Sequence, residues 1–128
     1  MIVRTLIAAA FTVALVQPAA AAERAPFTQA AFKAAQAQGR PVVVDVAAWW
    51  CPVCRSQHIK IKRITADHRF DRLLILRLDY DKQKADWRAL GVKKQATLIG
   101  YRGHQEVGRV AFQTNEALIA DLLTKTVQ

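Results

Sequence analysis

The sequence predicts one α/β domain in which a central mixed sheet of four strands is flanked by helices on both faces. Two runs predict central strands: residues 41–47, Pro-Val-Val-Val-Asp-Val-Ala, and residues 73–79, Leu-Leu-Ile-Leu-Arg-Leu-Asp. Neither run alternates apolar and polar residues, as expected for strands that are covered on both faces. A helix pattern lies between them, and a hairpin and a closing helix follow, so the predicted order is αβα, βα, ββα. This order makes the sheet mixed, since strands joined through a helix pair in parallel and a hairpin pairs antiparallel.

The first 22 residues have the pattern of a secretory signal peptide. Arg4 supplies a positive charge, residues 5–16 form an apolar run, and a Gln-Pro break precedes the small-residue tract 19–22. Cleavage is expected just before Glu23. The apolar run is shorter than the roughly 20 residues of a membrane-spanning helix, and an uncleaved N-terminal anchor is the alternative. Either reading places the domain, residues 23–128, on the exported side of a membrane, most simply in a bacterial periplasm.

The chain is strongly basic, with 19 Lys and Arg against 10 Asp and Glu and a formal net charge of +9. Removal of Arg4 lowers this charge by one, to +8. A basic surface can attract nucleic acid, anionic lipid or acidic proteins. Export argues against nucleic acid, and the sequence has no stripe of aromatic and basic residues to bind it. We therefore expect a soluble, monomeric domain with no nucleic-acid partner.

The first helix is expected after a short lead-in that ends at Ala25-Pro26. Thr28 is the expected N-cap, and Gly39 supplies the stop at the other end. Phe27, just before the cap, and Phe32, four residues after it, have the spacing of a hydrophobic staple.

A second helix is expected to start at the cysteine pair and to end near residues 66–69. After the second strand, residues 81–90 predict a short helix that Gly91 ends. Strands at residues 97–101 and 106–110 then flank the sequence Arg-Gly-His-Gln, which is a hairpin signal.

The closing helix is expected to begin after Thr114 or Asn115, either of which can serve as its N-cap. Glu116 stands in its first turn, where a negative charge is favourable. Apolar residues at helical spacing form one face: Leu118, Ile119, Leu122 and Leu123.

The motif Trp-Cys-Pro-Val-Cys holds the only two cysteines, Cys51 and Cys54. Two thiols separated by two residues at a helix start can form a disulfide without moving the backbone. The helix N-terminus offers free N–H groups and a positive dipole to a thiolate on Cys51, which lowers its pKa from about 8.5. Pro52 fits the first helical turn. The motif predicts dithiol–disulfide exchange, with Cys51 as the more exposed, attacking thiolate and Cys54 as the resolving thiol.

Other uses of two cysteines are less well supported by the sequence. A structural bridge this short would constrain the unfolded chain little. Zinc normally needs four ligands, and there is no second cysteine pair or His-x3-His element. Attachment of c-type haem needs His after the second cysteine, where this chain has Arg55. We expect no metal and no cofactor, while a module that binds a soft ion such as Cu(I) stays open.

With this motif the chain resembles the thioredoxin superfamily along nearly all of residues 23–128. Residues 43–51 resemble the strand that leads into the family's W-C-x-x-C sequence, and Gly91-Val92 with Thr97-Leu98 resembles its later loop and strand. The resemblance implies a thioredoxin-like fold and thiol–disulfide oxidoreductase activity on the disulfides of partner proteins.

Two branches of the superfamily show further similarity. Residues 39–45 and 108–112 are similar to the C-terminal periplasmic domain of DsbD-type transmembrane thiol reductases. Residues 50–55, with His58, are similar to the thiol reductases of cytochrome c maturation. Both similarities imply a reductase that receives electrons from a membrane thiol carrier. An oxidase or an isomerase is the alternative.

The chain departs from the family at the loop that faces the dithiol. Relatives usually carry a cis-proline before the Thr of this strand, whereas this chain has Ala96 before Thr97. A cis bond before Ala costs about 2.5–4 kcal/mol, so we expect the Gln95–Ala96 bond to be trans. The resemblance still implies a substrate-docking surface formed by Trp50, Pro52, Ala96 and Thr97, and core packing is the alternative for Trp50.

Several further residues have a functional and an ordinary interpretation. Asp45 lies in an apolar strand six residues before Cys51, where desolvation would raise its pKa and allow a proton relay with Cys54; the alternative is a solvated strand-end residue. Trp49 is expected to pack, and His58 to be a surface or hydrogen-bonded histidine. Three cations either favour the thiolate or are only solvated: Arg55, Lys93 and Lys94. His68 and His104 show no feature that indicates a function.

Overall fold

The computed structural model describes residue 14 and residues 21–128. The expected signal peptide therefore falls almost entirely outside the described residues. Among the residues that are described, no helix is both long and apolar enough to cross a bilayer.

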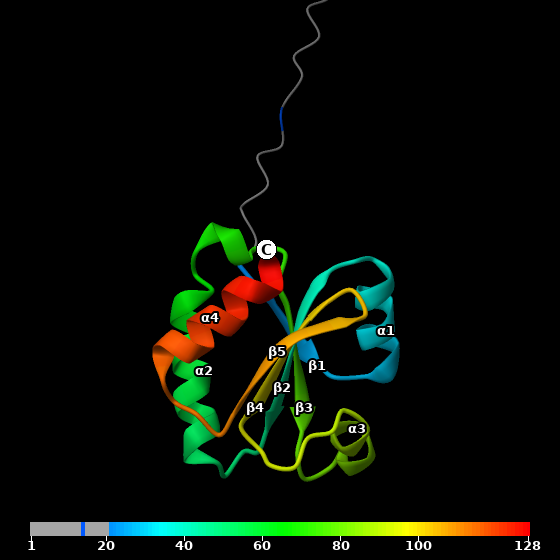
Figure 1. Cartoon of the computed structure of the whole chain (residues 1–128), viewed down its shortest axis with the longest axis vertical. Coiled ribbons are helices and arrows are strands. Elements are labelled where there is room, and N and C mark those ends of the chain that lie inside the picture. The colour runs from blue at the N-terminus through cyan, green and yellow to red at the C-terminus, as the bar shows by residue number, and fades with distance from the viewer. Residues whose placement is uncertain (1–13, 15–20) are drawn as a thin grey trace, which may run out of the picture.

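In the part of the chain that the structure describes, ten elements form one mixed sheet between two layers of helices (Figure 1). In chain order they are β1 (Glu23–Pro26), α1 (Gln29–Ala37), β2 (Pro41–Ala47), α2 (Pro52–Ile64), a 3₁₀ helix (His68–Phe70), β3 (Leu74–Asp79), α3 (Lys84–Ala89), β4 (Thr97–Arg102), β5 (Gln105–Ala111) and α4 (Glu116–Val127).

The five strands lie in the order β1-β3-β2-β4-β5. Strand β3 is parallel to β1 and to β2, β4 is antiparallel to β2, and β5 is antiparallel to β4. Helices α2 and α4 cover one face of the sheet, and α1 and α3 cover the other (Figure 1). The predicted mixed sheet between two helical layers is confirmed.

The sheet has five strands and not the predicted four, because the lead-in forms β1 at one edge. Its pairing rests on the backbone: the N–H of Glu23 donates to the Leu73 carbonyl at 3.0 Å, and the N–H of Phe27 donates to the Arg77 carbonyl at 2.8 Å. The sequence Glu-Arg-Ala-Pro has no apolar alternation that would mark a strand. Pro26 is tolerated because an edge strand leaves one side of its backbone unpaired.

The two faces of β2 supply two hydrophobic cores. Val42, Val44 and Val46 point toward α1 and α3 and pack with aromatic residues from that layer. Val43 points to the other face and packs with residues of α2, β3 and α4. Side chains alternate along a strand, so Asp45 lies on the same face as Val43, beneath α2. This face is where the cysteines are.

The ends of the helices follow local signals in the sequence. The Thr28 side chain accepts the N–H of Ala31 at 3.0 Å, and the rings of Phe27 and Phe32 lie 5.5 Å apart, which confirms the expected cap and staple. Gly39 has a φ of +64°, as a helix stop requires. Helix α3 starts later than predicted, at Lys84, because a turn precedes it: the Asp79 carboxylate accepts the N–H groups of residues 81 and 82 at 2.9 and 3.1 Å.

Candidate active site

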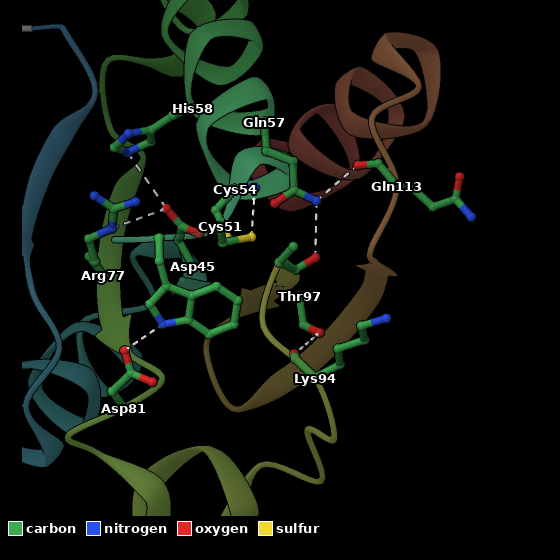
Figure 2. The surroundings of a disulfide bond; sticks show 12 residues. Asp45, Cys51, Cys54, Gln57, His58, Arg77, Asp81, Lys94, Thr97 and Gln113 are labelled. Carbon is green, nitrogen blue, oxygen red and sulfur yellow. Dashed lines mark hydrogen bonds and ion pairs between the residues drawn. A yellow bond between two sulfur atoms is a disulfide. The ribbon is translucent and has the colours of Figure 1, made fainter. Parts of the chain in front are cut away.

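The two cysteines form a disulfide at the N-terminus of α2 (Figure 2), with their Cα atoms 5.3 Å apart. Cys51 is the N-cap of the helix, and its Sγ accepts the N–H of Cys54 at 3.1 Å. Pro52 occupies the first helical position. The strand-to-helix junction thus gives the Cys51 sulfur one N–H donor and the positive end of the helix dipole.

Both cysteines are almost completely buried. Cys51 is 2% exposed and Cys54 is 3% exposed, so the disulfide form does not distinguish the two by exposure, and the greater exposure of Cys51 in the reduced protein stays a prediction. Three alanines pack around the sulfurs: Ala47, Ala48 and Ala96. A hollow of about 140 Å³ borders the disulfide, and its lining residues are Ala48, Trp49, Cys51, Cys54, Arg55, His58 and Arg77.

Asp45 lies on β2, between the disulfide and the side chains of His58 and Arg77 in the view of Figure 2. It is 2% exposed. Its Oδ2 is 3.7 Å from Nε2 of His58 and 3.9 Å from Nε of Arg77. Burial raises the pKa of Asp45 above its ordinary value of 3.8, while Arg77 and Arg24 act in the opposite direction. Asp45 is therefore not a solvated strand-end residue, and its proton affinity is set by this enclosed position.

His58 contacts the buried carboxyl group, which the sequence did not indicate. Burial lowers the pKa of His58 to about 4, and the positive charges of Arg77 and Arg24 act in the same direction. The imidazole is consequently neutral at pH 7, and its contact with Asp45 is not an ion pair at that pH. The side chain remains 35% exposed.

The two tryptophans before Cys51 are both on the surface. Trp49, expected to pack, is 86% exposed, and that expectation is wrong. Trp50 is 45% exposed, and its Nε1 donates to Oδ2 of Asp81 at 3.0 Å. Strand β2 ends at Ala47, so the residues that follow stand in a turn and are no longer held between two layers. Trp49 therefore joins Trp50 as an aromatic group beside the disulfide.

Ala96 packs against the disulfide from the loop before β4. No peptide bond among the described residues is cis, so the predicted trans bond before Ala96 is confirmed. Ala96 has a φ of +62°, a left-handed conformation that costs an ordinary residue about 1–2 kcal/mol. Its N–H donates to the Val46 carbonyl at 2.8 Å, and its carbonyl accepts the N–H of Phe112 at 2.9 Å. Proline cannot replace it without rearrangement, because proline fixes φ near −65° and has no N–H.

Thr97, the other residue expected on this docking edge, is also buried. Its hydroxyl donates to the carbonyl of Lys94 at 2.7 Å. Ala96 and Thr97 thus shape the wall of the site, but their own polar groups bond within the protein. Their role in docking a substrate stays a prediction.

Gln57 is a buried polar residue at the site that the sequence analysis missed. Its Nε2 donates to the carbonyls of Ala96 and Gln113, at 3.0 and 2.9 Å (Figure 2). Its Oε1 has no hydrogen-bond partner among the described residues. The amide joins α2 to the loop before β4 and to the chain after β5, so it holds the wall of the site in place. Only its position on the helical face of Cys54 could have indicated this, since glutamine is usually exposed.

The cations near the site differ in their surroundings. Arg55 lines the hollow beside the disulfide. Nζ of Lys94 lies 3.6 Å from the centre of the Phe112 ring, a cation–π contact, and Lys93 is exposed. Across the described ranges, 14 and 21–128, no three His, Cys, Asp or Glu residues converge to hold a metal ion.

Comparison with known proteins identifies the family. A model of the thioredoxin family, described as "Thioredoxin", matches residues 23–125. A thioredoxin of Alicyclobacillus acidocaldarius is 29% identical over 96 residues, which are 74% of this chain and 90% of the relative. Thioredoxin Asp f 29 of Aspergillus fumigatus is 28% identical over 80 residues, 62% of this chain and 73% of the relative.

Solved structures give the same result. Trxlp from Edwardsiella tarda superposes with a TM-score of 0.76 and 40% identity, covering 79% of this chain and 98% of that one. A thioredoxin of Malassezia sympodialis has a TM-score of 0.72 at 17% identity, covering 88% and 99%, which shows the shared fold. The chain therefore belongs to the thioredoxin family, and Cys51 and Cys54 are the redox pair of a protein thiol–disulfide oxidoreductase.

Proposed function

We propose that the protein is an exported reductase, which passes electrons from the Cys51–Cys54 dithiol to disulfides of partner proteins. The observation that carries this proposal is the burial of both cysteines close to a buried carboxyl group. Desolvation raises the pKa of a thiol, and a negative carboxylate nearby adds to the effect. A site that stabilises its thiolate makes the couple oxidising, so a site that disfavours the thiolate is a better reductant. Two features act in the opposite direction, because they stabilise a thiolate on Cys51: the N–H of Cys54 and the positive end of the helix dipole.

The reaction transfers two electrons in two exchange steps. The Cys51 thiolate attacks one sulfur of a partner disulfide, so that a mixed disulfide forms and the first partner thiolate leaves. Asp45 then takes the proton of the Cys54 thiol, and the Cys54 thiolate attacks Sγ of Cys51. The mixed disulfide breaks, the second partner thiolate leaves, and the Cys51–Cys54 disulfide is formed. A reduced thiol carrier returns the protein to the dithiol by the same steps in reverse.

Two features support export and a membrane electron donor. The first 22 residues have the signal-peptide pattern, and the family match begins at residue 23, where cleavage is expected. The resemblance to two groups of periplasmic reductases supports a thiol carrier in the membrane as the donor. The docking surface in this proposal is formed by Trp50 and Pro52, with Trp49 added because of its exposure.

The first prediction concerns the reduction potential of the Cys51–Cys54 couple. We expect equilibration with glutathione and dithiothreitol buffers to give a reduction potential of roughly −270 mV, the value of thioredoxin, because burial disfavours the thiolate. Alkylation of the free thiols at each buffer ratio gives the reduced fraction. A potential near about −120 mV would make the protein an oxidase and would contradict the proposed direction.

The second prediction concerns export. Expression of the full chain in a Gram-negative host should give a periplasmic protein whose N-terminus is Glu23 or a close neighbour, since the small-residue tract precedes it. Mass spectrometry of the purified protein measures the cleavage site. An intact Met1 in the membrane fraction would support the uncleaved anchor instead, and an intact Met1 in the cytoplasm would contradict export.

The third prediction separates the roles of the two cysteines. Replacement of Cys54 with Ala removes the resolving thiol, so partner proteins should accumulate as mixed disulfides on Cys51. Non-reducing electrophoresis of periplasmic extracts should show these adducts and their loss after reduction. The matched variant Cys51→Ala should give few or none, and the reverse pattern would exchange the assigned roles.

The fourth prediction concerns Asp45. The pKa of Asp45 is higher in the folded protein than in the unfolded chain, so the protonated carboxyl group stabilises the fold below pH 3.8. This contribution is lost as the pH rises through the pKa of Asp45 in the folded protein. Asp45→Asn should therefore be more stable than the wild type at pH 7, with the difference vanishing in acid, as measured by urea unfolding. The same variant should resolve mixed disulfides slower by about 10-fold or more.

Asp121→Asn is the control for this experiment, because Asp121 is exposed and pairs with Lys125 on the surface of α4. We expect it to change neither the pH dependence nor the rate. An Asp45→Asn variant with wild-type rates between pH 6 and 9 would remove Asp45 from the mechanism.

A further inference from the structure

His58 borders two separate hollows of the surface. The first is the hollow beside the disulfide, which His58 shares with Cys54 and Arg77. The second is a groove of about 430 Å³ next to β1, and its lining includes Arg24, Asp45, His58, Arg77 and Asp79. His58 and Arg77 are the two residues common to both. The side chain of His58 thus borders both the hollow at the redox pair and the groove that the buried carboxyl group lines.

The position of His58 on α2 fixes this arrangement. His58 follows Cys54 by four residues, so the two side chains share one face of the helix. Nε2 of His58 is 3.7 Å from Oδ2 of Asp45, while about a third of the side chain is open to solvent. The imidazole therefore faces the carboxyl group (Figure 2), while part of the side chain is open to solvent.

Charged groups approach His58 from every element around it. Asp45 comes from β2, Arg24 from β1, and Arg77 and Asp79 from β3. On α2 itself, Arg55 lines the same hollow as His58. Burial and the two arginines nearest Asp45 keep the imidazole neutral at pH 7. Its lone pair is then available to accept a proton.

We propose that His58 carries protons between the carboxyl group of Asp45 and solvent during disulfide exchange. This inference rests on the proposed relay through Asp45 but not on export or on the direction of electron transfer. When Asp45 has taken the proton of the Cys54 thiol, the carboxyl group passes it to Nε2 of His58. The imidazolium then releases a proton to water, and Asp45 is again a carboxylate. Reduction of the disulfide uses the same path inward.

Arg77 cannot carry protons between Asp45 and solvent, although it borders the same two hollows as His58. A guanidinium stays protonated in proteins and has no acceptor atom. Its charge instead lowers the pKa of His58, so that an imidazolium formed at this position releases its proton readily. His58 is a positioning residue in this scheme, because it acts on the reacting sulfur only through Asp45.

The test uses stopped-flow mixing of the reduced mature protein with dithiobis(nitrobenzoate). Attack by Cys51 releases the first thionitrobenzoate, and attack by Cys54 on the resulting mixed disulfide releases the second. The second, unimolecular phase measures the relay, because a proton that stays on Asp45 can return to the Cys54 thiolate before it attacks; the first phase measures Cys51 alone. The variants are His58→Ala, His58→Gln and, as the control, His104→Ala, which alters an exposed histidine in the β4–β5 turn.

We expect His58→Ala to slow the second phase about 10-fold or more at pH 7 in dilute buffer, with an unchanged first phase. Added imidazole should restore the rate of His58→Ala in proportion to its concentration and leave the wild type unaffected. His58→Gln keeps a polar side chain of similar size but has no basic nitrogen, so it should be equally slow and well folded. His104→Ala should match the wild type.

Two results would overturn the inference. One is a wild-type second phase in His58→Ala and His58→Gln, which would mean that water in the groove exchanges protons with Asp45 directly. The other is a slow second phase that neither imidazole nor pH alters, which would mean that His58 has only a packing role. Failure of the proposed reductase function is a separate result, since it would appear in the reduction potential and not in these two phases.

Discussion

The burial of β2 on both faces controls the chemistry of this protein. All seven residues of this strand are buried, so a carboxyl group at Asp45 is held away from water between the sheet and α2. The same strand ends directly before the turn that starts α2, which brings the two cysteines to the edge of the core. The hydrophobic packing that stabilises the fold is therefore also what raises the pKa of Asp45 and keeps the disulfide out of solvent.

The wall opposite the disulfide is built without the proline that the resemblance to the thioredoxin superfamily leads us to expect there. Ala96 and Phe112 are the non-glycine residues with positive φ in the described part of the chain, and they hydrogen-bond to each other. Each such conformation costs about 1–2 kcal/mol, and a typical hydrogen bond contributes about 0.5–1.5 kcal/mol. The bonds of Ala96 to Val46, Phe112 and Gln57 together offset this strain. A network of backbone and amide groups thus replaces a single cyclic residue.

Most of the fold could be predicted because its signals are local. Thr28, Phe27 and Phe32 define the first helix by spacing alone, and the apolar runs of β2 and β3 need no partner to be recognised. Strand β1 could not be predicted, because its four residues are ordered by the backbone of β3 and not by their own side chains. The cysteines and the buried acid were identified from local signals as well: the cysteines by their spacing at a helix start, and Asp45 as an ionisable group in an apolar run.

The surroundings of the cysteines depend on contacts between distant segments, which no local pattern encodes. His58 and Gln57 are neighbours on one helix, yet one meets a carboxyl group from β2 and the other meets carbonyls from the loop at Ala96 and the chain at Gln113. The exposure of Trp49 could not be predicted from the sequence, because it depends on where β2 ends and burial on both faces stops.

The two sulfurs of the redox pair differ in their electrostatic surroundings. The start of α2 and the N–H of Cys54 favour negative charge on Cys51, whereas burial disfavours negative charge on both sulfurs. In the proposed mechanism this asymmetry selects Cys51 as the attacking sulfur, and Cys54 stays a protonated thiol until a base removes its proton. In the same mechanism the buried Cys54 thiol gives its proton to an acid–base group within the core, and Asp45 is the carboxyl group that β2 supplies there. In the proposed relay His58 then connects this acid to solvent, so the scheme makes the contact between α2 and β2 part of the site.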